Sequence, residues 1–157
     1  MQTPRPFLLK TATWFLSFLA LTGLALTASA AEYMSVSKDG VNIRAGADTK
    51  AEILWEVFKD FPLQVLSKDG KWARIKDFEG DSGWIFAPLL SKKQTAIVKV
   101  KSANMRSGPG KNYEITATVK YGVVFNLVAQ ENGWAQLKHE DGTSGWIHAS
   151  LLWPENP

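Results

Sequence analysis

The sequence predicts an all-β protein of two similar small domains behind an N-terminal signal peptide. Three observations predict this fold class. Residues 33–91 are repeated at residues 95–153, turn-forming dipeptides separate short β-rich runs, and no stretch after residue 30 keeps a helical period. Several short strands in a unit of about 60 residues are typical of a small barrel or sandwich.

The repeat is an ungapped duplication at a constant offset of 62 residues, with identity at 18 of 59 positions. Its densest block is Ser-Gly-Trp-Ile-x-Ala-x-Leu-Leu at residues 82–90 and again at residues 144–152. A polar link, residues 91–95, joins the copies. Because a unit of this size buries little surface alone, we expect the two copies to pack together. We therefore expect one domain at residues 31–91 and a second at residues 92–157.

Residues 1–30 have the layout of a secretory signal peptide. Arg5 and Lys10 precede an apolar run at residues 14–26, small residues follow, and cleavage is expected after Ala30. An uncleaved membrane anchor is the alternative, but the run is shorter than the roughly 20 residues that span a bilayer. We expect a secreted protein, periplasmic or extracellular, with no stable membrane span after cleavage.

Charge and cysteine content exclude several functions. The formal net charge is +3, and removing Arg5 and Lys10 leaves 16 basic and 15 acidic side chains, a net +1. The mature chain therefore has no charge signature of nucleic-acid binding. The absence of cysteine from the sequence excludes disulfide bonds, thiolate metal sites and cysteine nucleophiles.

Each unit contains a predicted central hairpin. The turns are expected at Asp69-Gly70 in the first unit and at Asn132-Gly133 in the second. A later turn at residues 78–81, matched by residues 140–143, leads into the Gly-Trp-Ile strand. The β-rich runs that flank the hairpin turns are residues 63–66, 73–76, 125–128 and 135–138.

Four motifs follow one another in the second unit. They are Asn-Met-Arg-Ser-Gly-Pro-Gly at residues 104–110, Tyr-Glu-Ile at 113–115, Gly-Trp at 133–134 and Gly-Trp-Ile at 145–147. In this order and spacing they resemble bacterial SH3-like (SH3b) domains. The resemblance implies two tandem SH3-like β-barrels that bind in the cell envelope, often to peptidoglycan or peptides, and many such domains are attached to cell-wall hydrolases.

The first unit keeps only part of this pattern. It retains the Asn-x-Arg-x-Gly box at residues 42–46, but has Ala47-Asp48 where the pattern has Pro-Gly, and Ala51 in the position of Tyr113. We interpret the box as structural, since an arginine can tie loop carbonyls together with its several donors. Because Tyr113 suits a half-exposed groove, we predict that the second unit is the better binder.

Strand alternation places most tryptophans on one face of each unit. If Val65, Ala73, Ile75 and Ile85 point inward, the opposite face carries Arg74 and Gln136 together with an aromatic stripe. We define the aromatic stripe as Trp72, Trp84, Phe86, Trp134, Trp146 and His148. Three uses of the stripe stay open: a groove for an extended peptide, the surface on which the two units pack, or part of the core.

These observations favour a non-catalytic binding protein. The candidate ligand-binding residues are Tyr113, Trp134, Trp146, His148, Trp72, Trp84 and Phe86. His139 and His148 have poor metal-ligand spacing, and no catalytic motif is present, so we expect no catalytic residue, metal or cofactor. The expected partner is peptidoglycan or an envelope peptide. The alternative is a scaffold that docks another envelope protein through its aromatic surface.

Overall fold

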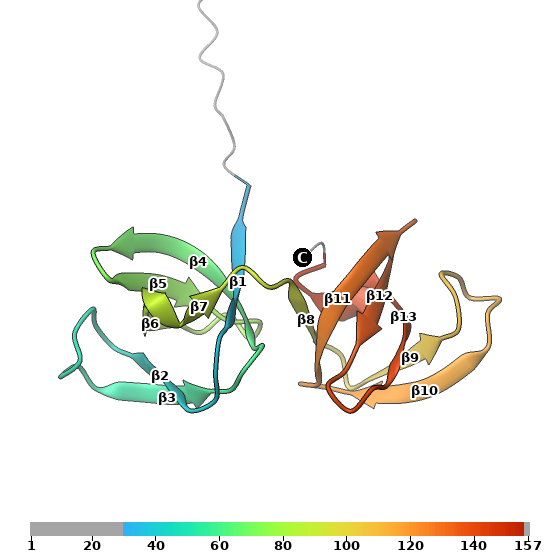
Figure 1. Cartoon of the computed structure of the whole chain (residues 1–157), viewed down its shortest axis with the longest axis horizontal. Coiled ribbons are helices and arrows are strands. Elements are labelled where there is room, and N and C mark those ends of the chain that lie inside the picture. The colour runs from blue at the N-terminus through green and yellow to red at the C-terminus, as the bar shows by residue number, and fades with distance from the viewer. Residues whose placement is uncertain (1–29, 156–157) are drawn as a thin grey trace, which may run out of the picture.

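The structure is a computed structural model that describes residues 30–155. Apart from Ala30, the predicted signal peptide lies outside the described residues. Figure 1 shows two β units side by side, joined by a short link. Within residues 30–155 no helix has the length and apolar character needed to cross a membrane.

The two units have the same element order. The first contains β1 (Glu32–Val36), β2 (Val41–Arg44), β3 (Ile53–Val57), β4 (Pro62–Asp69), β5 (Trp72–Lys76), β6 (Ser82–Phe86), the 3₁₀ turn η1 (Ala87–Leu89) and β7 (Leu90–Ser91). The second contains β8 (Thr95–Val98), β9 (Ser102–Arg106), β10 (Ile115–Lys120), β11 (Val124–Glu131), β12 (Trp134–Lys138), β13 (Ser144–His148), η2 (Ala149–Leu151) and β14 (Leu152–Trp153). The predicted all-β, tandem architecture is confirmed.

The sheets are open rather than closed barrels. The antiparallel order is β3-β2-β6-β5-β4-β1-β7 in the first unit and β10-β9-β13-β12-β11-β8-β14 in the second. The last strand of the first unit is two residues long and pairs only with β1, through Ser35 and Val36. Because the link begins directly after it, no strand remains to bridge the sheet to β3.

The central hairpin turns differ from the prediction in the first unit. Asp69 pairs with Trp72, so the turn consists of Gly70, with φ of 55°, and Lys71. In the second unit Asn132 and Gly133 form the predicted turn, with φ of 49° and 80°, as a type I′ hairpin requires. Residues 70–71 lie over residues 132–133 at the repeat offset, so the duplication itself identifies the correct turn.

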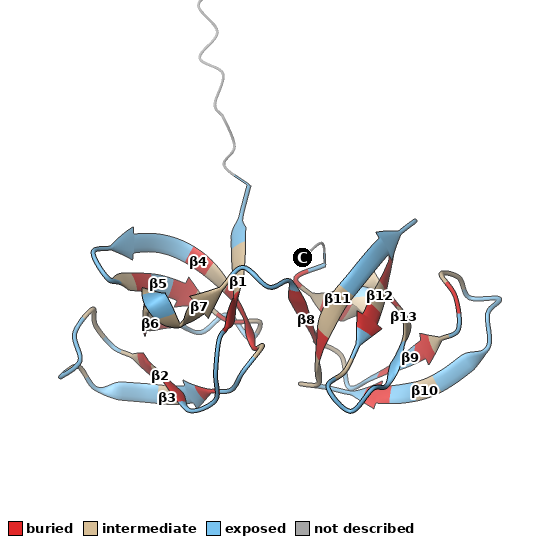
Figure 2. Cartoon of the chain, in the orientation of Figure 1, coloured by how far each residue is buried: buried red, intermediate tan, exposed pale blue. Residues whose placement is uncertain are grey.

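Each unit has its own core on the predicted inner face (Figure 2). Ala73, Ile75 and Ile85 have no exposed surface, and Val65 is 8% exposed, which confirms the predicted inward set. The second core is built from matching strands, with Met105, Leu137 and Ile147 fully buried. This alternation leaves the opposite face of β5, β6, β12 and β13 for the aromatic stripe.

The two units pack against each other, as expected for domains of this size. Ile97, Val124 and Trp153 of the second unit lie against the core of the first. Trp153 meets Tyr33 edge to face, with ring centroids 5.3 Å apart. In the link, Lys93 Nζ lies 2.8 Å from Asp60 Oδ2.

A second junction contact lies at the turn after β5. The ring of Phe78 contacts the ring of Tyr121 at 5.3 Å, and the Tyr121 hydroxyl donates to Glu79. In the described part of the chain, the aromatic contacts between the units thus involve Tyr33, Phe78, Tyr121 and Trp153. None of these belongs to the aromatic stripe, which leaves the stripe to the groove or the core.

Candidate functional site

The register of β12 and β13 builds the candidate site. Trp134 pairs with His148, and Gln136 pairs with Trp146, so these four side chains share one face, as predicted. The first unit repeats the arrangement with Trp72 opposite Phe86 and Arg74 opposite Trp84. Alternation along two paired strands is sufficient to produce this face.

Trp134 and His148 border a hollow in the second unit, of about 340 Å³. We call it the Trp134 hollow. Its lining consists of Ser102, Ala103, Asn104, Arg106, Lys111, Trp134, His148 and Leu151. The two rings meet edge to face, with centroids 5.2 Å apart. Trp134 is only 9% exposed, more covered than the outward prediction implied, because the imidazole packs against it.

The arginine of the Asn-x-Arg-x-Gly box holds the loop beside this hollow. Arg106 Nη1 donates to the carbonyl oxygens of Lys111, at 2.9 Å, and Tyr113, at 2.8 Å. In the first unit Arg44 Nη1 donates to Ala51 O at 2.7 Å. The structural interpretation of the box is therefore confirmed. In the second unit the same bonds also bring Lys111 to the rim of the hollow.

The charge of the lining decides what chemistry it suits. Arg106 and Lys111 are cationic, and none of the lining residues carries a carboxylate. His148 is held in place through Nδ1, which lies 2.7 Å from Ser150 Oγ and also receives the Ser150 backbone N–H at 3.4 Å. This pair caps η2, so the serine is a turn residue. The hollow thus combines an aromatic wall with a cationic rim.

Tyr113 lies on the same loop but outside the lining of the hollow. Its ring covers Gly108, where an added Cβ would lie 2.4 Å from the ring carbons Cδ1 and Cε1. The tyrosine is 44% exposed. Of the seven candidate residues, the structure thus places two at this hollow, Trp134 and His148.

The remaining candidates lie apart from the hollow. Trp146, Trp84, Trp72 and Phe86 are half-buried, and the last two meet edge to face at 5.7 Å in the first unit. Sequence reasoning missed the other six lining residues, Ser102, Ala103, Asn104, Arg106, Lys111 and Leu151. Arg106 could have been predicted from the Asn-x-Arg-x-Gly box, because an arginine that holds a loop also positions the side chains of that loop, here Lys111.

One acidic turn could bring carboxylates to a cation. The carboxylate oxygens of Asp77, Glu79 and Asp81 lie within 4.8 Å of one another. However, Asp77 Oδ1 accepts the backbone N–H groups of Glu79 and Asp81, at 3.0 and 2.9 Å. Burial is the main factor that raises the pKa of Asp77 above its usual value. These hydrogen bonds account for the cluster as turn residues, as predicted for Glu79 and Asp81.

Comparison with known proteins agrees with this architecture. The family model for the bacterial SH3 domain matches residues 37–92 and again residues 99–154. The chain belongs to the bacterial SH3 domain family. Each match covers one of the two open sheets except for its first strand, β1 or β8, so the SH3 units of the chain correspond to the two units described above.

The SH3 units are similar to parts of longer proteins. The chain is 28% identical to the Bacillus subtilis protein YrvJ, named as an N-acetylmuramoyl-L-alanine amidase, over 93% of this chain and 30% of that protein. It is 26% identical to a protein of Listeria innocua named as endopeptidase p60, over 85% of this chain and 28% of that protein. The chain thus spans less than a third of the length of these relatives.

Solved structures give a weaker likeness. An NlpC/P60 family protein from Bacillus cereus aligns with a TM-score of 0.37 and 10% identity, over 77% of this chain and 55% of that one. NlpC2 from Trichomonas vaginalis aligns with a TM-score of 0.37 and 14% identity, over 81% of this chain and 49% of that one.

Proposed function

We propose that this chain is a secreted, non-catalytic protein of the cell envelope whose second SH3 unit binds peptidoglycan through the Trp134 hollow. Membership of the bacterial SH3 family supports an envelope role. The names of the relatives support the wall as the partner, since N-acetylmuramoyl-L-alanine is the junction of sugar and stem peptide in peptidoglycan.

The observation that carries the proposal is the pairing of an aromatic wall with a cationic rim. Peptidoglycan presents apolar faces of sugar rings, which pack on indole and imidazole rings, and peptide carboxylates, which pair with ammonium and guanidinium groups. For the sugar faces the hollow offers the half-buried ring of His148, backed by Trp134, and for the carboxylates it offers Lys111 with Arg106. A volume of about 340 Å³ suits a sugar or a short peptide segment rather than a large ligand.

The experiment is co-sedimentation of residues 31–157 with purified, insoluble peptidoglycan. We expect the unaltered chain to be retained and to release no soluble wall fragments. Lys111→Glu should reduce retention about tenfold, because it reverses a charge on the rim. The matched control is Thr49→Glu, since Thr49 occupies the same position in the first unit.

His148→Phe is a second variant. The first unit has Phe86 at the matching position, so a phenylalanine is known to fit this fold there. We expect the variant to fold, as shown by an unchanged thermal transition, and to bind less well. Equal retention of Lys111→Glu and Thr49→Glu would contradict the proposal. Retention by an envelope protein in place of the wall would instead support the scaffold alternative.

A further inference from the structure

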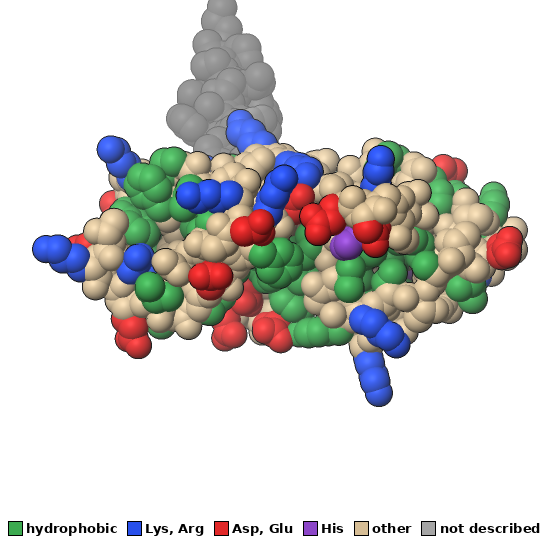
Figure 3. Space-filling model, turned by 60° about the horizontal axis from the view of Figure 1, so that its bottom comes forward, with side chains coloured by type: hydrophobic (Ala, Val, Ile, Leu, Met, Phe, Trp, Pro, Cys, Tyr) green, Lys and Arg blue, Asp and Glu red, His purple; other side chains and the backbone are tan. Residues whose placement is uncertain are grey.

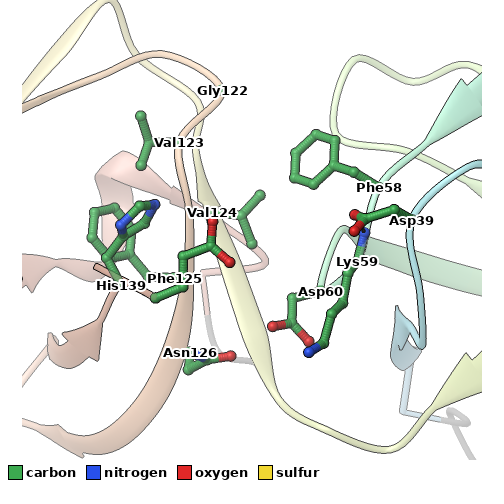
Figure 4. A pocket seen from close by; sticks show the side chains of 11 residues that line it. Asp39, Phe58, Lys59, Asp60, Gly122, Val123, Val124, Phe125, Asn126 and His139 are labelled. Carbon is green, nitrogen blue, oxygen red and sulfur yellow. Dashed lines mark hydrogen bonds between the residues drawn. The ribbon is translucent and has the colours of Figure 1, made fainter. Parts of the chain in front are cut away.

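A second hollow lies between the two units, outside the proposed wall-binding site. It has a volume of about 270 Å³ and is lined from both sides. The first unit contributes Phe58 and Asp60 among others, and the second contributes Val124, Asn126 and Glu140. We call it the junction groove. Because its walls come from different units, neither unit forms the groove alone (Figure 4).

One wall of the junction groove is apolar. Phe58 is 45% exposed, although its ring packs edge to face on Phe61 at 5.3 Å. Figure 4 shows Val123 and Val124 across the groove from Phe58. On the face seen in Figure 3, hydrophobic and acidic side chains gather in the middle of the molecule, where the units meet. An aliphatic chain in the groove would cover the exposed phenyl ring.

The polar atoms of the junction groove are mainly acceptors. The lining contains three carboxylates, Asp39, Asp60 and Glu140, against one lysine, Lys59. Asp39 Oδ1 accepts the Lys59 backbone N–H at 2.8 Å, and Asp60 pairs with Lys93 of the link. Among residues 30–155 Glu140 forms no ion pair, so its carboxylate remains available.

The side chain of Asn126 adds an independent observation. Its Oδ1 atom is buried and has no hydrogen-bond partner in the described part of the chain. Asn126 projects from β11 toward the gap, opposite Asp60 (Figure 4). A buried acceptor without a donor is destabilising, and a ligand N–H would satisfy it. A ligand that donates hydrogen bonds therefore suits this part of the groove, where Asn126 Oδ1 has no donor.

We propose that the junction groove binds a primary ammonium group on an aliphatic stem, as carried by a lysine-like side chain of a peptide. An ammonium group has three donors and no acceptor, which matches Asn126 Oδ1 and the neighbouring carboxylates. The methylene stem lies on Phe58 and Val124, as long cationic side chains do on apolar surfaces. A volume of about 270 Å³ is suited to one such side chain.

The test is an NMR titration of ¹⁵N-labelled residues 31–157 with Nα-acetyl-lysine methylamide. We expect saturable shifts of the amides of residues 58–60, 122–126 and 139–140, with a dissociation constant in the millimolar range. The matched probe is the same compound with its side-chain amine acetylated, which keeps the length and removes the charge. It should bind at least tenfold more weakly.

Variants locate the bound probe. Glu140→Gln should weaken binding three- to tenfold, whereas Glu131→Gln, the same change at the exposed end of β11, should leave binding unchanged. Asn126→Val removes the buried oxygen and should also weaken binding. A thermal melt of each variant verifies that it folds. If Asn126→Val does not fold, Glu140→Gln decides the test.

The proposal would be overturned by equal binding of the acetylated probe, or by a Glu140→Gln variant that binds normally. It would also be overturned if Lys111→Glu abolished the shifts, because the probe would then lie in the Trp134 hollow. The junction groove does not depend on the wall-binding proposal. If the chain failed to bind peptidoglycan but bound the lysine probe normally, only the wall-binding proposal would be contradicted.

Discussion

The loop between β2 and β3 and the matching loop between β9 and β10 differ at one contact. In the second unit Tyr113 lies over Gly108, so closely that a Cβ on the glycine would be 2.4 Å from the ring. In the first unit the same positions are Ala51 and Gly46, and a Cβ there would make an ordinary contact of 3.5 Å. Both loops are held by the arginine of the box. An arginine-tied loop can therefore change its surface while keeping its backbone.

The last strands of the two units differ in a similar way. Ser91 ends the first unit, and Trp153 occupies the matching position in the second, where it reaches back to Tyr33 and the first core. The difference shows how two repeated units can form a junction: one copy has a large apolar side chain where the other has a small polar one. The second unit thus carries both the Trp134 hollow and the main junction contact.

The largest expected effect comes from giving the second unit the residue of the first, Trp153→Ser. We expect a loss of about 2–3 kcal/mol in the free energy of unfolding, less than for a fully buried tryptophan because Trp153 is half-buried. Urea denaturation followed by circular dichroism measures it. The unaltered chain should unfold in one transition and the variant in two, and a single unshifted transition would contradict the role of Trp153.

Gly145→Ala should cost about 2 kcal/mol, because its Cβ would lie 2.8 Å from the backbone oxygen of Arg106 and 2.5 Å from Met105 Cγ. Gly83→Ala meets Ile43 Cγ2 at 2.4 Å but the Arg44 oxygen only at 3.1 Å. Since a backbone oxygen in a sheet cannot move aside, Gly145→Ala should cost at least as much. Thermal melts of both variants compare them, and a clearly larger loss for Gly83→Ala would reverse this ranking.

Gly108→Ala should cost about 1 kcal/mol, and Gly46→Ala should change stability by less than about 0.5 kcal/mol. The difference arises because Gly108 lies under the Tyr113 ring, whereas Gly46 faces only the Cβ of Ala51. A double-mutant cycle sharpens the comparison. In a Tyr113→Ala background, which copies the first unit, Gly108→Ala should become nearly neutral. An undiminished cost in that background would place the clash elsewhere.

The smallest effect concerns the pH dependence of Asp77. Burial raises the pKa of this carboxyl in the folded state, so its charged form opposes folding. Its contribution to stability is therefore present below the usual pKa of about 3.9 and is lost as the pH rises through the folded pKa. Asp77→Asn keeps an oxygen for the two turn N–H groups and should raise stability at pH 7 by only roughly half a kcal/mol, because these hydrogen bonds already offset part of the cost of burying the charge.

The control for Asp77 is Asp141 in the matching turn of the second unit. There the backbone N–H of Thr143, followed by its hydroxyl, lowers the pKa of the carboxyl. Its contribution is present above the usual pKa and is lost as the pH falls through the folded value, so Asp141→Asn should have the opposite sign. Unfolding measured from pH 3 to pH 7 tests both. Identical pH slopes for the two variants would contradict this contrast.

Much of the fold could be predicted, because period and repetition are local signals. Alternation placed Ala73, Ile75 and Ile85 inward, and their burial confirms it. It placed the tryptophans on the opposite face, where Trp72 and Trp84 are half-buried but Trp134 is more covered than predicted. The open sheet could not be predicted from sequence patterns. Closure would need the last strand, β7, to extend far enough to pair with β3, and β7 is only two residues long. The shift of the hairpin turn to Gly70-Lys71 was predictable from the repeat offset, but the Asp-Gly preference outweighed it in the prediction.

The candidate site was predictable only in part. Strand alternation identified Trp134 and His148, because it acts over two residues. Lys111 escaped notice because its position depends on two carbonyl bonds from Arg106 and on the path of a loop. The junction groove lay beyond sequence reasoning altogether, since Phe58 and Asn126 come to line one groove only when the two units pack together.

The link between the units has a consequence for proteolysis. Lys92 and Lys93 form the kind of dibasic segment that trypsin-like proteases cleave when it is accessible and can extend into the enzyme. Here the ammonium group of Lys93 is bound to Asp60, and the carbonyl oxygen of Gln94 accepts the Leu127 N–H at 3.0 Å. Both contacts must break before Lys93 can extend into a protease, so they slow cleavage after this residue, and Asp60→Asn should speed it.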